Sequence, residues 1–238
     1  MSYALTDALI LFGGYNLSGD LNKVGMDLEA GEEVDTTFGD SFHSRPGSQL
    51  ADAKMMADGF WQSATSAAPD PQAINALGAA GTLVTVCDLS TTGATAYMLG
   101  ILEAKYTQED PIGQVRPFGI EGSGSSGVGP VRGKLLLPVT SLTGSTTGTG
   151  YQLGTVSSTQ KAYITIHVTV AGTTADVIVE SDDNSGFTSA TTRSTTTVTS
   201  VGSPTVAAVA GAITDDYWRV RVANVTGTFS IAVAVGIK

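Results

Sequence analysis

The chain has 238 residues, of which 42% are hydrophobic and 14% charged, and its formal net charge is −10. Lys and Arg supply the affinity of proteins for phosphate, so a chain with 12 of them against 22 acids is not expected to wrap nucleic acid. It has no run of about 18 apolar residues and no basic leader followed by an apolar run at the N-terminus, so neither membrane insertion nor secretion is expected.

The charge is divided unevenly along the chain. Residues 1–130 carry 16 acids and five basic residues, whereas residues 131–238 carry six acids and seven basic residues. A strongly acidic half beside a nearly neutral half rich in Thr, Val and Gly favours two folded units with different roles. We therefore predict a first domain over 1–122, a Gly/Ser linker over 123–130 and a second domain over 131–238.

The first half begins with a predicted hairpin, in which the apolar residues 8–12 are followed by Gly13, Gly14 and residues 15–17. Glycine readily supplies the positive φ angles that two-residue hairpin turns need. Further on, a short helix is predicted over 70–77, with Asp70 as its N-cap. The other predicted strands of this half are 51–62, 82–89, 95–107 and 112–122.

Apolar and charged side chains alternate over residues 23–29. A period of two places apolar groups on one face of a strand and charge on the other, so Asp27 and Glu29 should lie on a solvated face. Several copies that closed into a ring would lose their strand edges and turn such a face inward. An acidic wall repels phosphate and would let DNA pass without adhesion.

A long polar segment over residues 31–49 separates two of these strands. Connections of this length usually have a purpose. We interpret it either as a solvated hairpin tip or as a loop that contacts a partner, because aromatic side chains stand among charged ones. Its candidate contact residues are Glu32, Glu33, Phe38, Asp40, Phe42 and Arg45.

The second half is predicted to be a β-sandwich of jelly-roll or immunoglobulin-like type, because short alternating strands recur at sandwich spacing. Trp218, Val220 and Val222 are expected in its core, with Arg219 and Arg221 pointing outward. The predicted strands are 135–140, 150–156, 162–170, 175–180, 191–200, 205–209, 217–223 and 228–235.

The sequence offers no constellation of residues that would support catalysis. The two histidines, His43 and His167, stand in no recognisable nucleophile turn, and without Cys or Glu at ligand spacing they do not predict zinc. Cys87 is alone, which excludes an internal disulfide and favours a buried apolar role. The acidic segment 182–186 lacks the spaced acidic ligand of a helix-loop-helix calcium site. We expect no enzymatic activity, no cofactor and no metal.

Four segments of the first half carry a resemblance in pattern and order: Leu11–Asn22, Asp27–Asp35, Thr36–Asp40 and Asp58–Trp61. They resemble the opening of the major tail proteins, or tail tube proteins, of long-tailed bacteriophages. The resemblance covers roughly residues 1–130. It implies an all-β fold, a tail-tube-like β-sandwich or barrel flanked by a short helix, followed here by the second sandwich in the place of the domain that some relatives append outside the tube.

The resemblance also implies an assembly. Copies of the chain would form hexameric rings that stack into a tail tube with other virion proteins, assembled in the cytoplasm of the host bacterium. DNA or the tape-measure protein would pass through the lumen without sequence-specific binding. Asp27 and Glu29 are then candidates for the lumen wall, and the segment 31–49 for a contact with a neighbouring subunit.

Two other functions stay open at this point. A capsid decoration or head-surface protein suits a β-sandwich equally well. A carbohydrate-binding or adhesin module would use exposed aromatic residues of the second half, for which Tyr151, Tyr163, Tyr217 and Trp218 are the candidates, although Trp218 reads as core.

Overall fold

The computed structural model describes residues 7–32, 47–65, 68–109, 112, 114–125 and 128–238. In this part of the chain the fold is built from strands and one short helix, α1 (Pro69–Ala76). The strands are β1 (Leu9–Phe12), β2 (Tyr15–Asn16), β3 (Leu21–Glu32), β4 (Gly47–Phe60), β5 (Ala80–Cys87), β6 (Thr95–Gln108), β7 (Pro117–Gly124), β8 (Val131–Leu142), β9 (Thr146–Thr147), β10 (Tyr151–Gln152), β11 (Lys161–Val170), β12 (Thr174–Asp182), β13 (Thr191–Val198), β14 (Val209–Ala210), β15 (Tyr217–Thr226) and β16 (Phe229–Ile237). The predicted all-β fold with one short helix is confirmed.

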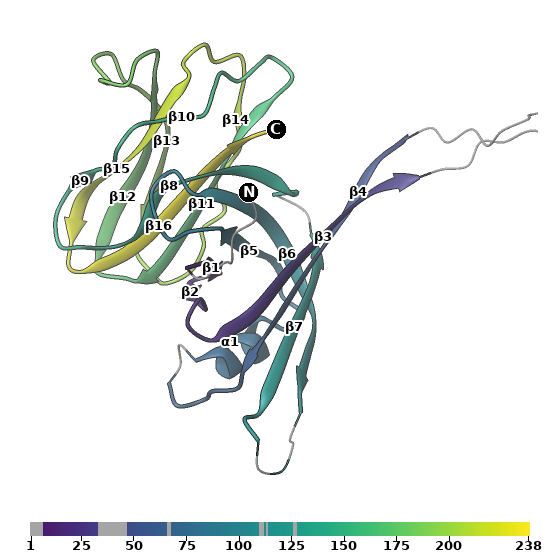
Figure 1. Ribbon diagram of the computed structural model, residues 1–238. Helices are drawn as coiled ribbons and strands as arrows, with labels where there is room; N and C mark the ends of the chain where they lie inside the picture. Colours follow the sequence, from purple (N-terminus) through teal and green to yellow (C-terminus); the bar gives the residue numbers. More distant parts are fainter. Residues whose placement is uncertain (1–6, 33–46, 66–67, 110–111, 113, 126–127) are drawn as a thin grey trace, which may run out of the picture.

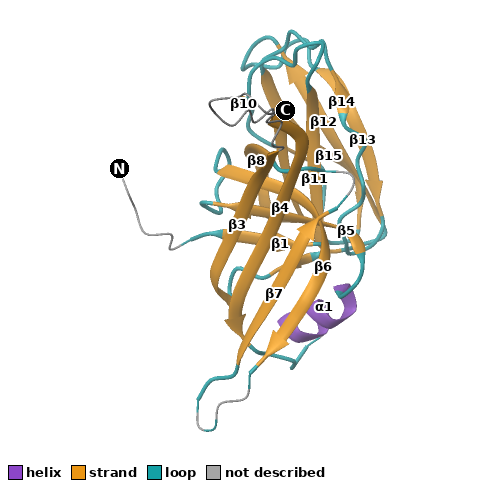
Figure 2. Ribbon diagram, turned by 90° about the vertical axis from the view of Figure 1, so that its right-hand side faces the viewer, coloured by secondary structure: helices purple, strands orange, loops and turns teal. Residues whose placement is uncertain are grey.

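The strands form two antiparallel sheets (Figures 1 and 2). The larger follows the order β14-β11-β16-β8-β6-β5-β1-β2, and β7, β4 and β3 continue from β6 as a branch. The smaller follows the order β10-β15-β12-β13, with β9 also paired to β15. We call β1 to β7 with α1 the N-terminal part, and β8 to β16 the C-terminal part. The described residues contain no helix that is long and apolar enough to cross a membrane.

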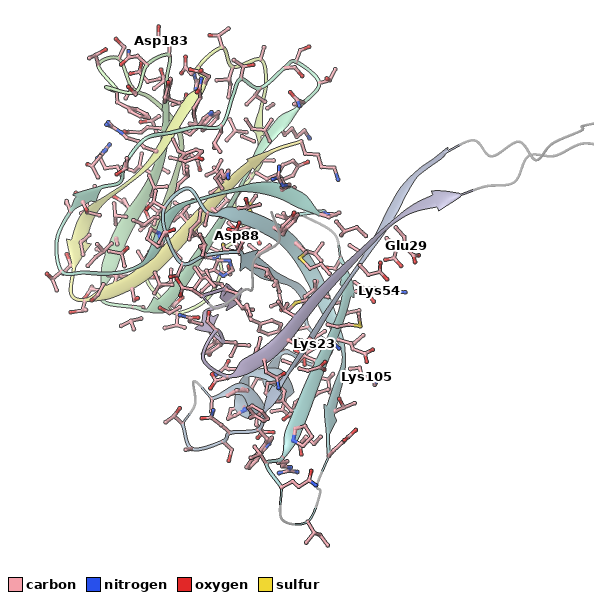
Figure 3. All side chains as sticks on the ribbon, viewed as in Figure 1. Lys23, Glu29, Lys54, Asp88, Lys105 and Asp183 are labelled. Atoms are coloured by element: carbon pink, nitrogen blue, oxygen red, sulfur yellow. The ribbon has the colours of Figure 1, made fainter. Side chains whose placement is uncertain are left out.

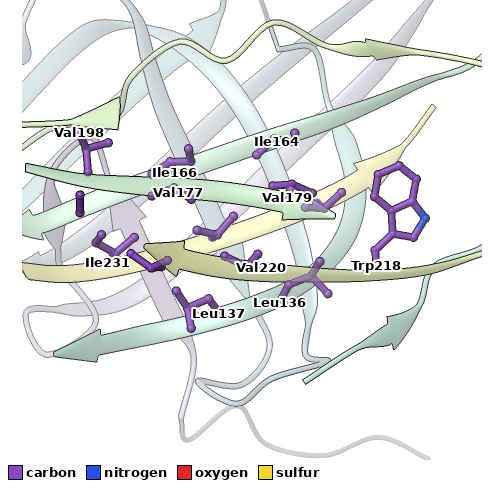
Figure 4. Packing of buried hydrophobic residues seen from close by; sticks show 14 of the residues in the cluster. Leu136, Leu137, Ile164, Ile166, Val177, Val179, Val198, Trp218, Val220 and Ile231 are labelled. Atoms are coloured by element: carbon purple, nitrogen blue, oxygen red, sulfur yellow. The ribbon is translucent and has the colours of Figure 1, made fainter. Parts of the chain in front are cut away.

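The C-terminal part is a sandwich whose core lies between the smaller sheet and strands β8, β11 and β16 (Figure 4). Alternation along the strands builds it, since Ile164, Ile166 and Val168 are buried on one face of β11. Trp218 is fully buried, and its indole N–H donates to the carbonyl of Gly154 over 3.1 Å. The expected core position of Trp218 is thereby confirmed.

A second apolar cluster joins the two parts of the molecule. It combines Leu9 and Leu83 from the N-terminal part with Leu135, Ala232 and Ala234 from the C-terminal part. Strands β8 and β16 therefore contribute one face to the sandwich and the other face to this cluster. The two parts share buried surface instead of meeting only through a connecting segment.

The segment predicted as a linker, 123–130, is packed where the structure describes it. It begins with the last residues of β7, and the N–H of Ser125 donates to the carbonyl of Gly100 over 2.8 Å. Val128 is buried, and its carbonyl accepts a hydrogen bond of 2.7 Å from Gly100. Because β8 then pairs with β6, one sheet crosses the predicted boundary. This differs from a flexible linker, while the division into two domains stays a prediction.

The N-cap of helix α1 lies two residues earlier than predicted. It is Ala68, so the prediction of Asp70 in that position is wrong. Asp70 lies in the first turn, where its carboxylate accepts hydrogen bonds of 2.6 Å from Tyr106 and from Gln108. These partners on β6 hold the side chain, and the helix contributes the buried Ala73 to a third apolar cluster beneath β4, β6 and β7.

Candidate assembly surface

Strands β3, β4, β7 and β6 form a four-stranded antiparallel sheet, which we call the branch sheet (Figure 2). Along β4 the burial alternates, with Ala53, Met55 and Ala57 buried toward α1 while Lys54 and Met56 are exposed. The branch sheet therefore has a dry face against the third apolar cluster and a solvated outer face. The sequence pattern predicted this two-sided character for β3, and pairing extends it to the neighbouring strands.

The outer face of the branch sheet carries charge from all four strands (Figure 3). Lys23 of β3 contacts Asp58 of β4 over 3.1 Å, and Lys105 of β6 contacts Glu121 of β7 over 2.7 Å. Both ion pairs are about half-exposed, and such pairs contribute little to stability. Carboxylates outnumber lysines on this face, which is therefore mildly acidic. Its charged residues are Lys23, Asp27, Glu29, Asp52, Lys54, Asp58, Lys105 and Glu121.

Asp27 and Glu29 lie on this outer face, as the alternation predicted. Asp27 stands opposite Lys54 in the register, whereas Glu29 stands opposite Asp52, so two carboxylates face each other where the hairpin leaves the sheet. Their role as lumen residues stays a prediction. The candidate contact residues Glu33, Phe38, Asp40, Phe42 and Arg45 lie outside the described residues, as does the side chain of Glu32.

The β3-β4 hairpin extends beyond the rest of the branch sheet (Figure 1). Strand β7 pairs with β4 from Lys54 to Phe60, so among the described strands only β3 pairs with the part of β4 from Gly47 to Ala53. The strands run further into the segment 31–49 than the sequence indicated. The result is a two-stranded arm that projects from the body, with Leu28 half-exposed at its base.

Both edges of the branch sheet lack a strand partner within the described residues. Strand β3 pairs only with β4. At the other side, β5 pairs with β6 as far as Leu102, and no described strand pairs with β6 beyond that residue on the side opposite β7. Unpaired edges expose rows of backbone N–H and C=O groups that readily pair with another chain.

Glu103 is a buried acid on the dry side of this sheet, and it was not among the residues predicted from the sequence. Glu103 is 0% exposed, and neither of its carboxylate oxygens has a hydrogen-bond partner among the residues that the structure describes. Burial raises the pKa of Glu103 to about 7. The available signal was one acid at an inward position of an alternating strand, on the same face as Leu99 and Ile101.

The outward face of the C-terminal sandwich holds a partly buried charge cluster. Glu180 of β12 accepts hydrogen bonds of 2.8 Å from Arg219 and 2.9 Å from Arg221, both on β15. Burial raises the pKa of Glu180, but the hydrogen bonds and charges of the two arginines outweigh burial and lower it. The guanidinium of Arg219 also lies 4.3 Å from the ring centre of Phe187. This cluster is internally paired, and no group of acids, His or Cys suited to a metal occurs among the described residues.

The aromatic candidates for sugar binding do not form an exposed platform. Trp218 is fully buried, and Tyr151, Tyr163 and Tyr217 are half-buried. Tyr151 packs its ring against Gly93, where an added Cβ would lie 2.5 Å away, so this tyrosine serves the contact between the two parts. Cys87 is buried as predicted, and burial, with a smaller effect of Asp88, raises the pKa of its thiol to about 12.

No protein-family model matches the sequence, and no curated protein matches it. Among solved structures, the chain is similar to a chain of the virion of a native gene transfer agent particle, with a TM-score of 0.43 and 10% identity over 54% of this chain and 98% of that chain. It is similar to the SPP1 Dit protein, described as a paradigm of the hub adsorption apparatus in phages that infect Gram-positive bacteria, with a TM-score of 0.39 and 9% identity over 97% of this chain and 99% of that chain. A chain from the tail of an empty gene transfer agent particle with C6 symmetry gives a TM-score of 0.40 and 10% identity over 52% and 96%. All three are too distant for a shared function to be concluded from them.

Proposed function

We propose that this chain is a structural subunit of a bacteriophage tail, in which branch sheets of successive copies join edge to edge and form the wall of stacked rings. The observation that carries the proposal is the branch sheet itself. It has one solvated face and two edges without a strand partner among the described residues, at β3 and at β6 beyond Glu103, whose carbonyl accepts a hydrogen bond from Gly78. A closed barrel removes both edges at once, which an isolated subunit cannot do.

The strand directions support closure by simple rotation. Each neighbouring pair within the branch sheet is antiparallel, and the sheet has four strands. With an even number of strands, β3 of a rotated copy meets β6 of the previous copy in the antiparallel sense. The alternation then continues around the whole ring, so every interface is the same and no parallel pair interrupts it.

Closure would place the outer face of the branch sheet toward the channel. At a strand spacing of ~4.8 Å and a tilt of about 40°, six copies would give a barrel roughly 50 Å across at the backbone. Asp27 and Glu29 would then line the wall beside Lys54 and the other charged residues of this face. A wall with a small excess of carboxylates is solvated and repels DNA phosphate, which favours passage without adhesion.

The arm formed by β3 and β4 would reach a neighbouring subunit or the adjacent ring. Its outer portion, from Gly47 to Ala53 on β4, pairs with no strand other than β3 within the described part of the chain. A two-stranded ribbon is only marginally stable by itself in water, so a neighbour that packs against it would stabilise it. The residues of the segment 31–49 would then meet the neighbour, in line with the resemblance to tail tube proteins.

Electron microscopy of the purified full chain across a concentration series tests this proposal. We expect rings or stacked rings with a central channel that is lined by the branch sheet, and the C-terminal sandwich outside. Immunogold labelling of particles would separate a tail from a head-surface location. A chain that stays monomeric at millimolar concentration, or labelling of the head alone, would overturn the proposal.

A further inference from the structure

His167 lies at the centre of a buried polar cluster. Its imidazole is 0% exposed. Nδ1 lies 2.7 Å from the carbonyl oxygen of Gly13, which can only accept, so Nδ1 carries the proton. Nε2 lies 2.7 Å from the hydroxyl of Thr85 and therefore accepts a hydrogen bond from it, while the Thr85 oxygen lies 3.0 Å from the hydroxyl of Thr165. The cluster is satisfied when the imidazole is neutral.

This cluster connects the two parts of the molecule where no strands pair. Gly13 and Thr85 belong to the β1-β2 turn and to β5, whereas His167 belongs to β11, whose strand partners are β14 and β16. The turn also touches the segment before β14, because a Cβ on Gly14 would lie 2.5 Å from the backbone nitrogen of Gly202. The larger sheet curls so that β11 lies near the β1-β2 turn. The His167 hydrogen bonds and the packing of Gly14 against Gly202, instead of strand pairing, hold these two elements together.

Among the described residues, none of the groups packed around His167 supplies a negative charge to balance an imidazolium. On the face of β11 that carries His167, the titratable neighbours are Tyr163 and, at the start of the strand, Lys161. On the facing side of β5 the titratable group is the Cys87 thiol, and none of the three is a carboxylate. The β1-β2 turn, the segment 199–204 and the facing positions of β16 contribute only uncharged residues. Burial lowers the pKa of His167 to about 4, although its hydrogen bond to Gly13 opposes this effect.

We propose that His167 forms a pH-sensitive contact between the two parts of the molecule. The neutral imidazole holds the C-terminal sandwich against the N-terminal part, and its protonation in mild acid releases the sandwich. Protonation puts a hydrogen on Nε2, so the hydroxyl of Thr85 must turn away and donate to Thr165 instead. The Nε2–H group can then donate to the Thr85 oxygen, so a hydrogen bond remains possible. The positive charge of the imidazolium, however, stays buried without a carboxylate partner, and burying an unpaired charge costs free energy. In the open form the imidazole is hydrated and binds a proton readily, so acid favours that form.

The size of the acid response follows from the pKa of His167 in the open form and in the closed form. With an open-state pKa near 6.5 and a closed-state pKa of about 4, the population of the open form rises by about 30-fold between pH 7.5 and pH 5. Hydrogen exchange measured by mass spectrometry, corrected for the intrinsic effect of pH, would detect this change in the full chain. We expect faster exchange in residues 13–17, 82–87 and 199–204, with β12 and β13 still protected.

Two histidine variants and an NMR titration of the imidazole test whether His167 causes the acid response. His167→Gln can donate to Gly13 and accept from Thr85 without ever becoming charged, so the acid response should disappear. His43→Gln removes the other histidine of the chain and should leave the response intact. In the unaltered protein, nitrogen NMR of the ring should show the Nδ1–H form and a midpoint below pH 5. A midpoint near 6.5, an unchanged response in His167→Gln, or loss of protection in β12 and β13 at the same time would overturn the proposal.

Discussion

Replacing Glu103 by Gln should stabilise the protein at alkaline pH and leave it nearly unchanged in acid. Glu103 is fully buried on the dry side of the branch sheet, and neither carboxylate oxygen has a hydrogen-bond partner within the described residues. Folding therefore costs free energy whenever this carboxyl must ionise. Glutamine has nearly the same shape but stays neutral at every pH.

The magnitude follows from the pKa of Glu103, which burial raises from 4.5 to about 7. At ~1.4 kcal/mol per pKa unit, the full effect is about 3 kcal/mol. The folded state binds more protons than the unfolded state between pH 4.5 and pH 7, so the free energy of unfolding falls as pH rises through that window. Above pH 7 the loss is complete, and below pH 4.5 it is absent.

Urea denaturation at pH 4.5 and pH 8 measures this difference. We expect the free energy of unfolding of Glu103→Gln to exceed that of the unaltered protein by up to ~3 kcal/mol at pH 8 and by less than ~1 kcal/mol at pH 4.5. Glu121→Gln is the matched control, because Glu121 is half-exposed on the outer face and its ion pair with Lys105 is worth little. An equal gain at both pH values, or no gain at pH 8, would refute the reasoning.

Three further predictions, the first with a control substitution, test contacts described above. Gly14→Ala would press a Cβ against Gly202, and we expect a loss of roughly 1–3 kcal/mol by thermal melting, whereas Gly19→Ala, with open space around it, should cost less than ~1 kcal/mol. Trp218→Ala should cost about 3–5 kcal/mol in urea because it empties the core of the sandwich, and a smaller loss would contradict its placement there. Glu180→Gln should cost about 2 kcal/mol at pH 7 by urea denaturation, and since the folded pKa of Glu180 is lowered, the difference from the unaltered protein should shrink as pH falls below about 4.5.

Local alternation in the sequence predicted much of the fold. The strand β15 shows why, since Trp218, Val220 and Val222 are buried while Arg219 and Arg221 lie toward the outer side. The Gly13-Gly14 hairpin was also predicted correctly, because glycine supplies the positive φ that its turn needs, and Gly13 has a φ of 56°. In both cases the physical cause lies within a few residues of chain.

Long-range contacts were beyond the reach of the same reasoning. His167 looked like an ordinary strand histidine, because its partners Gly13 and Thr85 are distant in sequence and come close only when the larger sheet curls. Val170 continues the apolar alternation of Ile164, Ile166 and Val168, yet it is 48% exposed where β11 ends. The linker prediction over 123–130 relied on composition, and composition does not report that Val128 is buried against β6.

The candidate site was predicted in part. Alternation identified Asp27 and Glu29 as solvated residues, but it could not indicate that β4, β7 and β6 would bring Lys54, Lys105 and other charges to the same face. The unpaired edges of the branch sheet are a property of topology. No pattern within one strand predicts which of its neighbours will be missing.

Disulfide cross-linking between copies tests the central claim most directly. Lys23 on β3 and Thr107 on β6 lie at opposite edges of the branch sheet, in one row of the register and on the outer face. The double variants Lys23→Cys/Thr107→Cys and Asp27→Cys/Thr107→Cys sample two registers of edge pairing, and Cys87 is buried and should not interfere. The edge-to-edge account predicts a ladder of covalent oligomers in at least one double variant and no ladder longer than a dimer in the single variants. Monomer alone in both double variants, under conditions where the protein is folded and concentrated, would contradict it.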